Sequence, residues 1–121
     1  MSSRVPSRDT RTETAVIANG ASLSGAVGTG GLELAAIITP AAWTSADLTF
    51  QASHDNTNFY NCYISSADTE VTIQADTSRF ITVPAGTLSG ASFVKVRSGT
   101  AASAVNQGAA RNVVLIFRTA A

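Results

Sequence analysis

The feature that most constrains the fold is an alternation of apolar and polar residues in short runs. The segments 46–53, 92–98 and 111–119 each carry an apolar side chain at about every second position. Successive side chains of a β-strand point to opposite faces, so this period predicts strands with one buried face. No window of a dozen residues follows the 3.6-residue period of a helix, and five glycines between residues 20 and 31 disfavour a helix there. The pattern therefore predicts an all-β fold.

Turn-forming residues separate these runs at intervals of roughly ten residues, as in β-sandwiches. Pro40 closes the first run, in which Leu32, Leu34, Ala36 and Ile38 alternate and are expected to share one face. The pattern predicts a jelly-roll-like antiparallel β-sandwich, although an immunoglobulin-like topology fits the same strands. The expected strands cover residues 31–38, 46–53, 59–64, 70–75, 79–84, 92–98 and 111–119.

The chain is expected to divide into an extended N-terminal arm, residues 1–20, and one sandwich domain, residues 21–121. The first 14 residues are rich in Ser, Thr and Arg and show no periodic apolar pattern. Arg4, Arg8 and Arg11 alternate with two carboxylates, so the arm carries too little net charge to act as a nucleic-acid tail. It is expected either to lie as a strap on another subunit, with its arginines on carboxylates, or to be disordered. Deleting these 14 residues should leave a folded domain.

The charge balance limits the classes of partner. Charged residues make up 13% of the chain, about half the usual share, and the formal net charge is zero. Phosphate binding needs a clustered excess of cations, so nucleic acid is not expected as the main partner. Low charge is typical of a protein that packs against other subunits, because free monomers usually keep more charge for solubility. We also expect no membrane span and no signal peptide, and hence synthesis in a cytoplasm.

The only tryptophan, histidine and cysteine fall between residues 39 and 63, which raises the question of a catalytic site. His54 and Asp55 are adjacent, and neighbouring side chains diverge in a strand or turn, so they are poorly placed to act as a catalytic pair. Cys62 lies in an expected strand, where a free thiol behaves as a small buried hydrophobe. A single cysteine also excludes an intrachain disulfide and a cysteine-based zinc site. We expect no enzymatic activity.

The polar residues of this segment have a simpler interpretation as a turn. Asp55 and Asn56 accept turn conformations, and Asp side chains bond to their own backbone. Asp55, Asn56 and Asn58 offer oxygens to Ca²⁺, but the further carboxylates of such sites are missing, so no metal and no cofactor are expected. Trp43 is interpreted as a plug at one end of the sandwich. The alternative is an exposed side chain that stacks on a sugar ring or contacts a protein.

Two blocks of residues resemble a group of small tailed-bacteriophage proteins. The first block is a Pro-x-x-Trp-Thr start followed by Leu-Thr-Phe-Gln-x-Ser-x-Asp, and the second contains Lys-x-Arg-Ser-Gly-Thr and a final Arg-x-x-x-Leu strand. The resemblance spans residues 32–118. Asn56 departs from it, because Gly usually follows the Asp, yet Asn also tolerates left-handed backbone. The matching residues are Pro40, Trp43, Thr44, Leu48, Thr49, Phe50, Gln51, Ser53, Asp55, Phe93, Lys95, Arg97, Ser98, Gly99, Thr100, Gln107, Arg111 and Leu115.

This resemblance implies a virion structural protein: a capsid decoration or cement protein on the phage head, made in the host cytoplasm. Its implied partners are the major capsid protein and copies of itself, as a dimer or trimer at capsid symmetry positions. A carbohydrate- or receptor-binding module of a head fibre or tail fibre is the alternative, with Trp43 and Tyr60 or Tyr63 as stacking platforms. The residues expected to contact a partner are Arg4, Arg8, Arg11, Trp43, His54, Asp55 and Asn56.

Overall fold

A computed structural model describes residues 10–65 and 68–119. Over these residues the protein is all-β, with antiparallel pairing throughout and no helix, and hence none long and apolar enough to cross a membrane. The strands are β1 (Thr10–Ile17), β2 (Val27–Gly28), β3 (Glu33–Ile38), β4 (Leu48–Ser53), β5 (Tyr60–Asn61), β6 (Tyr63–Ile64), β7 (Thr69–Glu70), β8 (Phe80–Thr82), β9 (Phe93–Ser98) and β10 (Arg111–Arg118).

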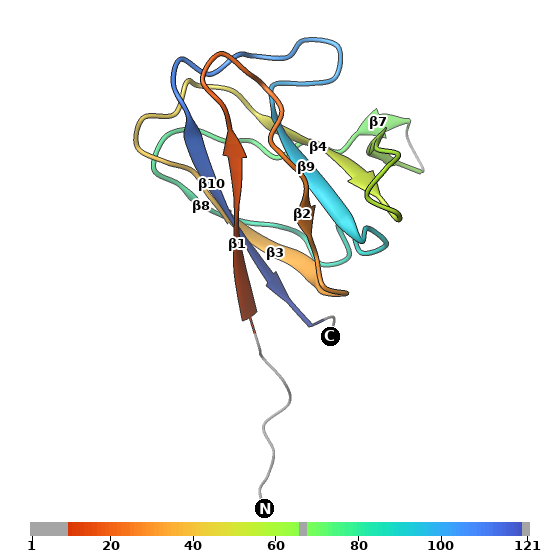
Figure 1. Ribbon diagram of the computed structural model, residues 1–121. Helices are drawn as coiled ribbons and strands as arrows, with labels where there is room; N and C mark the ends of the chain where they lie inside the picture. The colour runs from red at the N-terminus through yellow and green to blue at the C-terminus, as the bar shows by residue number, and fades with distance from the viewer. Residues whose placement is uncertain (1–9, 66–67, 120–121) are drawn as a thin grey trace, which may run out of the picture.

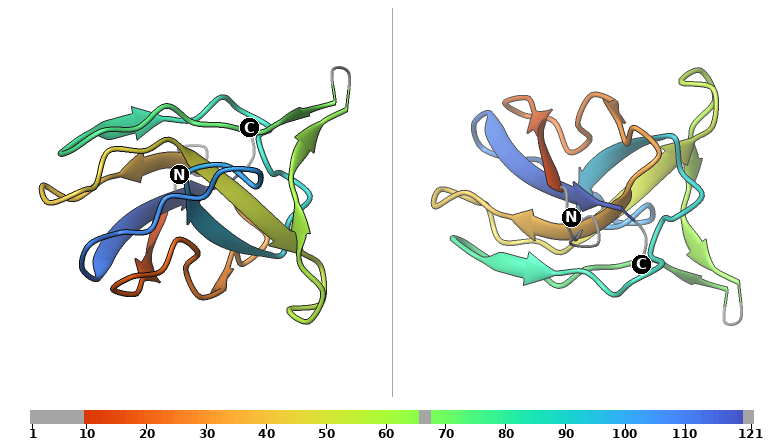
Figure 2. Two further views of the ribbon diagram at one scale, coloured as in Figure 1. Left: turned by 90° about the horizontal axis from the view of Figure 1, so that it is seen from above. Right: turned by 90° about the horizontal axis from the view of Figure 1, so that it is seen from below.

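Eight of these strands form two four-stranded sheets. Sheet A has the order β1-β10-β3-β8, and sheet B has the order β2-β9-β4-β5. The two remaining strands, β6 and β7, pair with each other in a separate ribbon. Figure 1 shows this ribbon projecting from the body on the side of sheet B. The views from above and below in Figure 2 show it lying beyond β4 and β9.

Both sheets contribute side chains to a single core cluster. Alternation along the strands selects them, as the sequence predicts for β4, β9 and β10. From sheet A, Val113, Leu115 and Phe117 are fully buried, and from sheet B Leu48 and Phe50 are equally inaccessible. Each such side chain contributes about 1.5–3 kcal/mol of transfer free energy on burial. The core therefore accounts for the period of two in the sequence.

The alternation predicted for residues 32–38 is wrong in its second half. Leu34 is buried opposite Phe117, but the register shifts at this point, and Ala36 pairs with Ile116. A β-bulge leaves one extra residue on its strand and reverses which face the following side chains occupy. Ile37 is consequently the fully buried residue, and Ile38 lies on the outer face of sheet A.

The expected arm over residues 1–20 also needs correction. Residues 10–17 are not an extended arm but β1, which pairs with β10 along its whole length. Ala15 and Ile17 are 1% and 0% exposed, so this strand closes one edge of the core. Its periodic pattern is short and diluted by three threonines and two charges between residues 10 and 17, which hid it in the sequence. Within the glycine-rich segment that follows, Val27 and Gly28 form β2 and pair with β9.

The edge of sheet B is interrupted by the ribbon. Tyr60 and Asn61 pair with β4, and the amide of Cys62 donates to the carbonyl of Phe50 at 3.3 Å. The chain then leaves the edge and returns, because the amide of Val71 donates to the carbonyl of Cys62 at 2.9 Å. We call the residues of this excursion, Tyr63–Ile64 and Thr69–Glu70 with their connection, the projecting hairpin.

Candidate contact surface

The predicted contact residues do not form one site. Arg4 and Arg8 lie outside the described residues. Arg11 lies on β1, where its Nη2 donates to the carbonyl of Gly28 at 2.7 Å and its Nε lies 3.2 Å from a Glu13 carboxylate oxygen. Arg11 therefore fastens β1 to β2 within the domain, and 40% of its side chain remains exposed.

Trp43 is buried, with 4% of its surface exposed, and belongs to the core cluster. Its indole Nε1 donates to the carbonyl of Ala46 at 3.1 Å, so the one polar atom of the ring is satisfied locally. This agrees with the interpretation of Trp43 as a plug. It rules out the alternative role of this side chain as an exposed stacking platform, because no face of the ring is accessible.

The loop after β4 is a closed hydrogen-bonded turn, as predicted. The Asp55 carboxylate accepts from the amides of Thr57 and Asn58, both at 2.9 Å, and from the Ser53 hydroxyl at 2.9 Å. These bonds, led by those from the Asn58 and Thr57 amides, hold the pKa of Asp55 well below its usual range. Asn56 has a φ of 60°, the left-handed conformation that Asn tolerates.

His54 and Asp55 do not form a catalytic pair. The His54 Nε2 lies 3.9 Å from Asp55 Oδ2, and 77% of the imidazole side chain is exposed. The Asp55 oxygens are already occupied by donors of the loop. Within residues 10–65 and 68–119, no group of three His, Cys, Asp or Glu side chains is placed to hold a metal ion.

Cys62 lies beside the base of the projecting hairpin. Its thiol is partly buried, and this burial raises the pKa of Cys62 to about 11. The nucleophilic form of cysteine is the thiolate, so the buried thiol is unreactive near neutral pH. This agrees with the prediction that Cys62 packs as a small hydrophobe.

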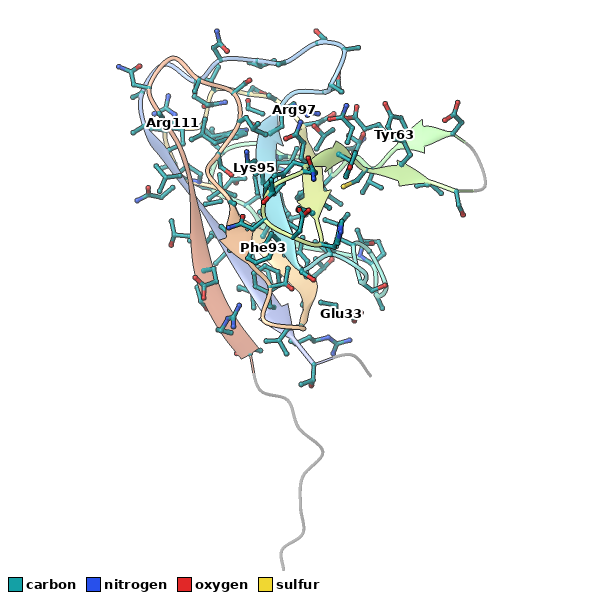
Figure 3. All side chains as sticks on the ribbon, turned by 45° about the vertical axis from the view of Figure 1, so that its right-hand side comes forward. Glu33, Tyr63, Phe93, Lys95, Arg97 and Arg111 are labelled. Carbon is teal, nitrogen blue, oxygen red and sulfur yellow. The ribbon has the colours of Figure 1, made fainter. Side chains whose placement is uncertain are left out.

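Sequence reasoning missed a buried ion pair that fastens the projecting hairpin to sheet B. Arg97 of β9 donates from Nη1 to a Glu70 carboxylate oxygen at 3.0 Å, and from Nη2 to Asn61 Oδ1 at 2.6 Å. The two charged side chains are only 8% and 14% exposed. Glu70 also accepts from the amide of Ala101, and Arg97 from β9 also donates to the Thr49 hydroxyl. Figure 3 shows Arg97 at the base of the hairpin and Tyr63 farther out on it.

One sequence pattern could have pointed to this pair. Arg97 lies in an alternating strand whose polar face would normally be solvated, and charged residues are scarce in the chain. The pairing of Arg97 with Glu70 is nevertheless non-local, because the two residues lie 27 positions apart in the chain. Only the return of the hairpin to the sheet edge brings them together.

The hairpin presents large apolar side chains to solvent. Tyr63 is 53% exposed and Ile64 is 47% exposed, and Tyr60, at the adjoining sheet edge, is 61% exposed. Beside them lies a hollow of about 510 Å³, lined by residues 62–64 and 71–73 at the hairpin base and by the loop Pro84–Leu88. Leu88 holds a φ of 57°, an unfavourable conformation for a bulky residue. We call Tyr60, Tyr63 and Ile64 the hairpin surface.

Several residues that carry the phage-protein resemblance meet at one end of the domain. Gln107, 1% exposed, accepts from the amide of Thr44 at 2.8 Å and donates to the Thr44 carbonyl at 3.0 Å. It also donates to the Ser98 hydroxyl at 2.7 Å and accepts from Arg111 Nε at 3.1 Å. These four residues therefore join three separate segments of the fold, and their contacts are internal to the domain.

In comparisons with known proteins, no family model matches the chain, and neither a curated protein nor a solved structure matches it.

Proposed function

We propose that this chain is a non-enzymatic capsid decoration protein, which binds the outer surface of a phage head and stabilises contacts between major capsid subunits. The observation that carries a contact role is the projecting hairpin, whose exposed Tyr63 and Ile64 stand on a base fixed by the buried Arg97–Glu70 pair. Rigid aromatic anchors of this kind contribute most to protein interfaces, because little conformational entropy is lost when they are buried. The virion setting follows from the sequence resemblance.

The strand order supports a jelly-roll β-sandwich. If β5, β6 and β7 are counted as one interrupted strand, eight strand positions remain. Consecutive positions then alternate between the two sheets, except where β4 is followed by its neighbour β5 within sheet B. Jelly rolls recur in viral capsid domains and in lectins, so this architecture fits both the decoration protein and the alternative. We place the finished protein on the virion surface after synthesis in the host cytoplasm.

A co-sedimentation assay with phage heads that lack this protein tests the proposal. The double variant Tyr63→Ser/Ile64→Ser should fold normally and bind heads at least tenfold more weakly than the natural chain, because truncated hot-spot residues cost about 2 kcal/mol or more. Val16→Ser is the matched control, since Val16 is 48% exposed but lies on β1. Equal binding by the double variant and the control would refute the role of the hairpin.

A second assay addresses the N-terminal residues proposed as a strap. Because β1 begins at Thr10, deletion of residues 1–14 would remove part of a core strand and confuse binding with folding. Deletion of residues 1–8 avoids this. If the segment straps a neighbouring subunit, the shortened protein should keep its unfolding free energy and lose affinity for heads. Unchanged affinity would remove the strap from the proposal.

The alternative, a carbohydrate-binding module of a head or tail fibre, rests on the exposed Tyr60 and Tyr63 rings beside hollows of the surface. Aromatic rings of this type can stack on sugars. A glycan array probed with the natural chain and with Tyr60→Ala and Tyr63→Ala separates the two functions. Saturable glycan binding that both variants abolish would favour the fibre module, whereas head binding without glycan binding favours decoration.

A further inference from the structure

The outer face of sheet A carries two rows of side chains without a charge. Directly opposed residues of antiparallel strands place their side chains on the same face, so the registers of sheet A define these rows. We call the two rows together the sheet A patch. Its first row is Thr14, Val114, Ile38 and Phe80, and its second row is Thr12, Ile116, Ala36 and Thr82.

Four of the eight side chains of this patch are exposed, three are half-buried, and Ala36 is buried with 5% of its surface exposed. Phe80 is 64% exposed and is the most exposed of the large apolar side chains among the described residues. Val114, Ile116 and Ile38 are half-buried by their neighbours, and the threonines at both edges are exposed. An antiparallel sheet with one solvated face normally carries polar residues there. The sheet A patch departs from that rule, because five of its eight side chains are apolar.

The outer face of sheet B offers a comparison within the same molecule. It carries Lys95 and Arg97, both of which are engaged inside the domain. The Lys95 ammonium lies 4.3 Å from the centre of the Phe59 ring, and Arg97 is paired with Glu70. Gln51 and Thr49 lie on the same face, and the half-buried Phe93 is the one apolar residue that β4 and β9 place there. The outer face of sheet A is thus more apolar than that of sheet B, which the low charge of the chain does not by itself explain.

We propose that the sheet A patch is the interface with a second copy of this chain. In a two-fold symmetric pair the same surface meets itself, so any charge near the axis meets a like charge. A face of eight uncharged residues is compatible with that symmetry. The charged residues of the same face, Glu33 and Arg118, occur together in the row beyond the patch, at the end of β3 and β10.

The size of the face sets the expected strength of the pair. Strands of eight, eight, six and three residues, at about 3.3 Å per residue and about 4.8 Å between strands, present a face of roughly 400 Å² per copy. A pair would bury about 800 Å² in total, which is below the usual size of specific interfaces and typical of weak, transient contacts. We therefore expect a weak dimer with a dissociation constant in the high micromolar range, at an intersheet distance of about 10 Å. The inference deepens the proposed contact function and rests on it, since a weak pair becomes stable when both copies are bound to one shell.

Sedimentation velocity of the purified full-length chain tests the pair directly. Over a series from low to several hundred micromolar, the 12.4 kDa chain should shift from monomer towards a species of twice that mass. Thr14→Glu places a charge at an exposed edge position, and Val114→Glu places one in the central strand. Each should weaken association at least tenfold, because two like charges then meet across the interface. Gln51→Glu, on the outer face of sheet B, is the matched control and should associate like the natural chain.

Mixing supplies a decisive second measurement. Val114→Glu and Val114→Lys should each remain monomeric alone, and an equimolar mixture should recover association, because opposite charges then face each other. A natural chain that stays monomeric throughout the series would overturn the inference, as would dimers that Thr14→Glu and Val114→Glu leave intact. No phage head is present in these two experiments, so they test only the pairing of copies through the sheet A patch. Binding to heads through the projecting hairpin is tested separately by co-sedimentation, and either result can fail without the other.

Discussion

Gly99 is a residue at which the backbone admits no side chain. It holds a φ of +88°, and a Cβ at this position would lie 2.6 Å from the carbonyl oxygen of Ser103 and 2.7 Å from the amide of Val105. Its carbonyl also accepts from the buried Thr49 hydroxyl at 2.7 Å. Both the left-handed conformation and the adjacent backbone therefore require glycine at the end of β9.

Gly99→Ala should lower the free energy of unfolding by at least about 2 kcal/mol, because the substitution adds left-handed strain and a backbone clash. Gly25→Ala is the matched control, since Gly25 has an ordinary φ and no atom within 4 Å of its Cβ position. Urea unfolding followed by circular dichroism measures both. A cost for Gly99→Ala no larger than that of the control would contradict the geometry.

Asp55 should give the protein a specific sensitivity to acid. Its carboxylate is stabilised by amides of the folded loop, so its folded pKa lies below the unfolded value. The contribution to stability is therefore complete above the unfolded pKa of about 4 and is lost as the pH falls below it. Asp55→Asn should flatten the dependence of the unfolding free energy on pH below this value.

Urea titrations from pH 6 downward test this prediction. Asp68→Asn is the control, because Asp68 is an exposed carboxylate in a turn with a φ of 49°, a conformation that Asn also tolerates. The control should retain the acid dependence of the natural chain. If the unfolding free energies of the natural chain and of Asp55→Asn fell in parallel with pH, the hydrogen bonds of the loop would not be the cause of the acid dependence.

At the scale of elements, the projecting hairpin and its ion pair form one unit. The buried guanidinium of Arg97 is tolerated because Glu70 and Asn61 accept hydrogen bonds from it. Of these two partners, Glu70 belongs to the projecting hairpin. A buried pair contributes little relative to an apolar replacement, whereas removal of one partner leaves an uncompensated charge. The hairpin should therefore determine whether Arg97 stabilises the sheet.

In the full chain, Arg97→Met should cost about 2–4 kcal/mol, since Glu70 loses its partner. In a second protein, an Asn-Gly turn replaces residues 63–70 and joins Cys62 to Val71, which are already hydrogen-bonded. There Arg97→Met should be neutral or stabilising. The four free energies of unfolding form a double-mutant cycle. Equal effects of Arg97→Met in both backgrounds would show that the pair does not anchor the hairpin.

At the scale of the whole molecule, the chain closes its first strand on its last. Thr10 pairs with Arg118, and β10 lies between β1 and β3 in the middle of sheet A. The strands on either side of β10 depend on it for their backbone hydrogen bonds, and three residues of β10 are fully buried. The core is incomplete until the residues from Arg111 onward have been added.

A chain that ends at residue 110 should therefore show no cooperative urea transition, although it keeps the residues of nine of the ten strands, because β1 then has no strand to pair with. The intact chain should unfold in one transition and refold slowly for its size, because its pairings are non-local. Stopped-flow fluorescence of the buried Trp43 measures both processes. A cooperative transition in the shortened chain would show that sheet B and the rest of sheet A form a core without β10.

The sequence by itself determined the features that depend on local chemistry. Alternation placed Val94 and Val96 on the buried face of β9, and the residues Asp55 and Asn56 specified the turn after β4. These predictions hold because a period of two and a left-handed turn residue act within a few positions of the chain. The indole of Trp43, predicted as a plug, is buried for the related reason that a single large ring is most stable in the core.

Only the tertiary structure decided the rest, because it depends on residues far apart in the chain. The bulge opposite Phe117 moved Ile38 to the outer face of sheet A, and pairing with β10 made a core strand of residues 10–17. The Arg97–Glu70 pair exists because the hairpin returns to the sheet edge. Register and edge pairing arise between strands, and no pattern within one strand encodes its partner. The two candidate contact surfaces, the hairpin surface and the sheet A patch, both result from such pairings.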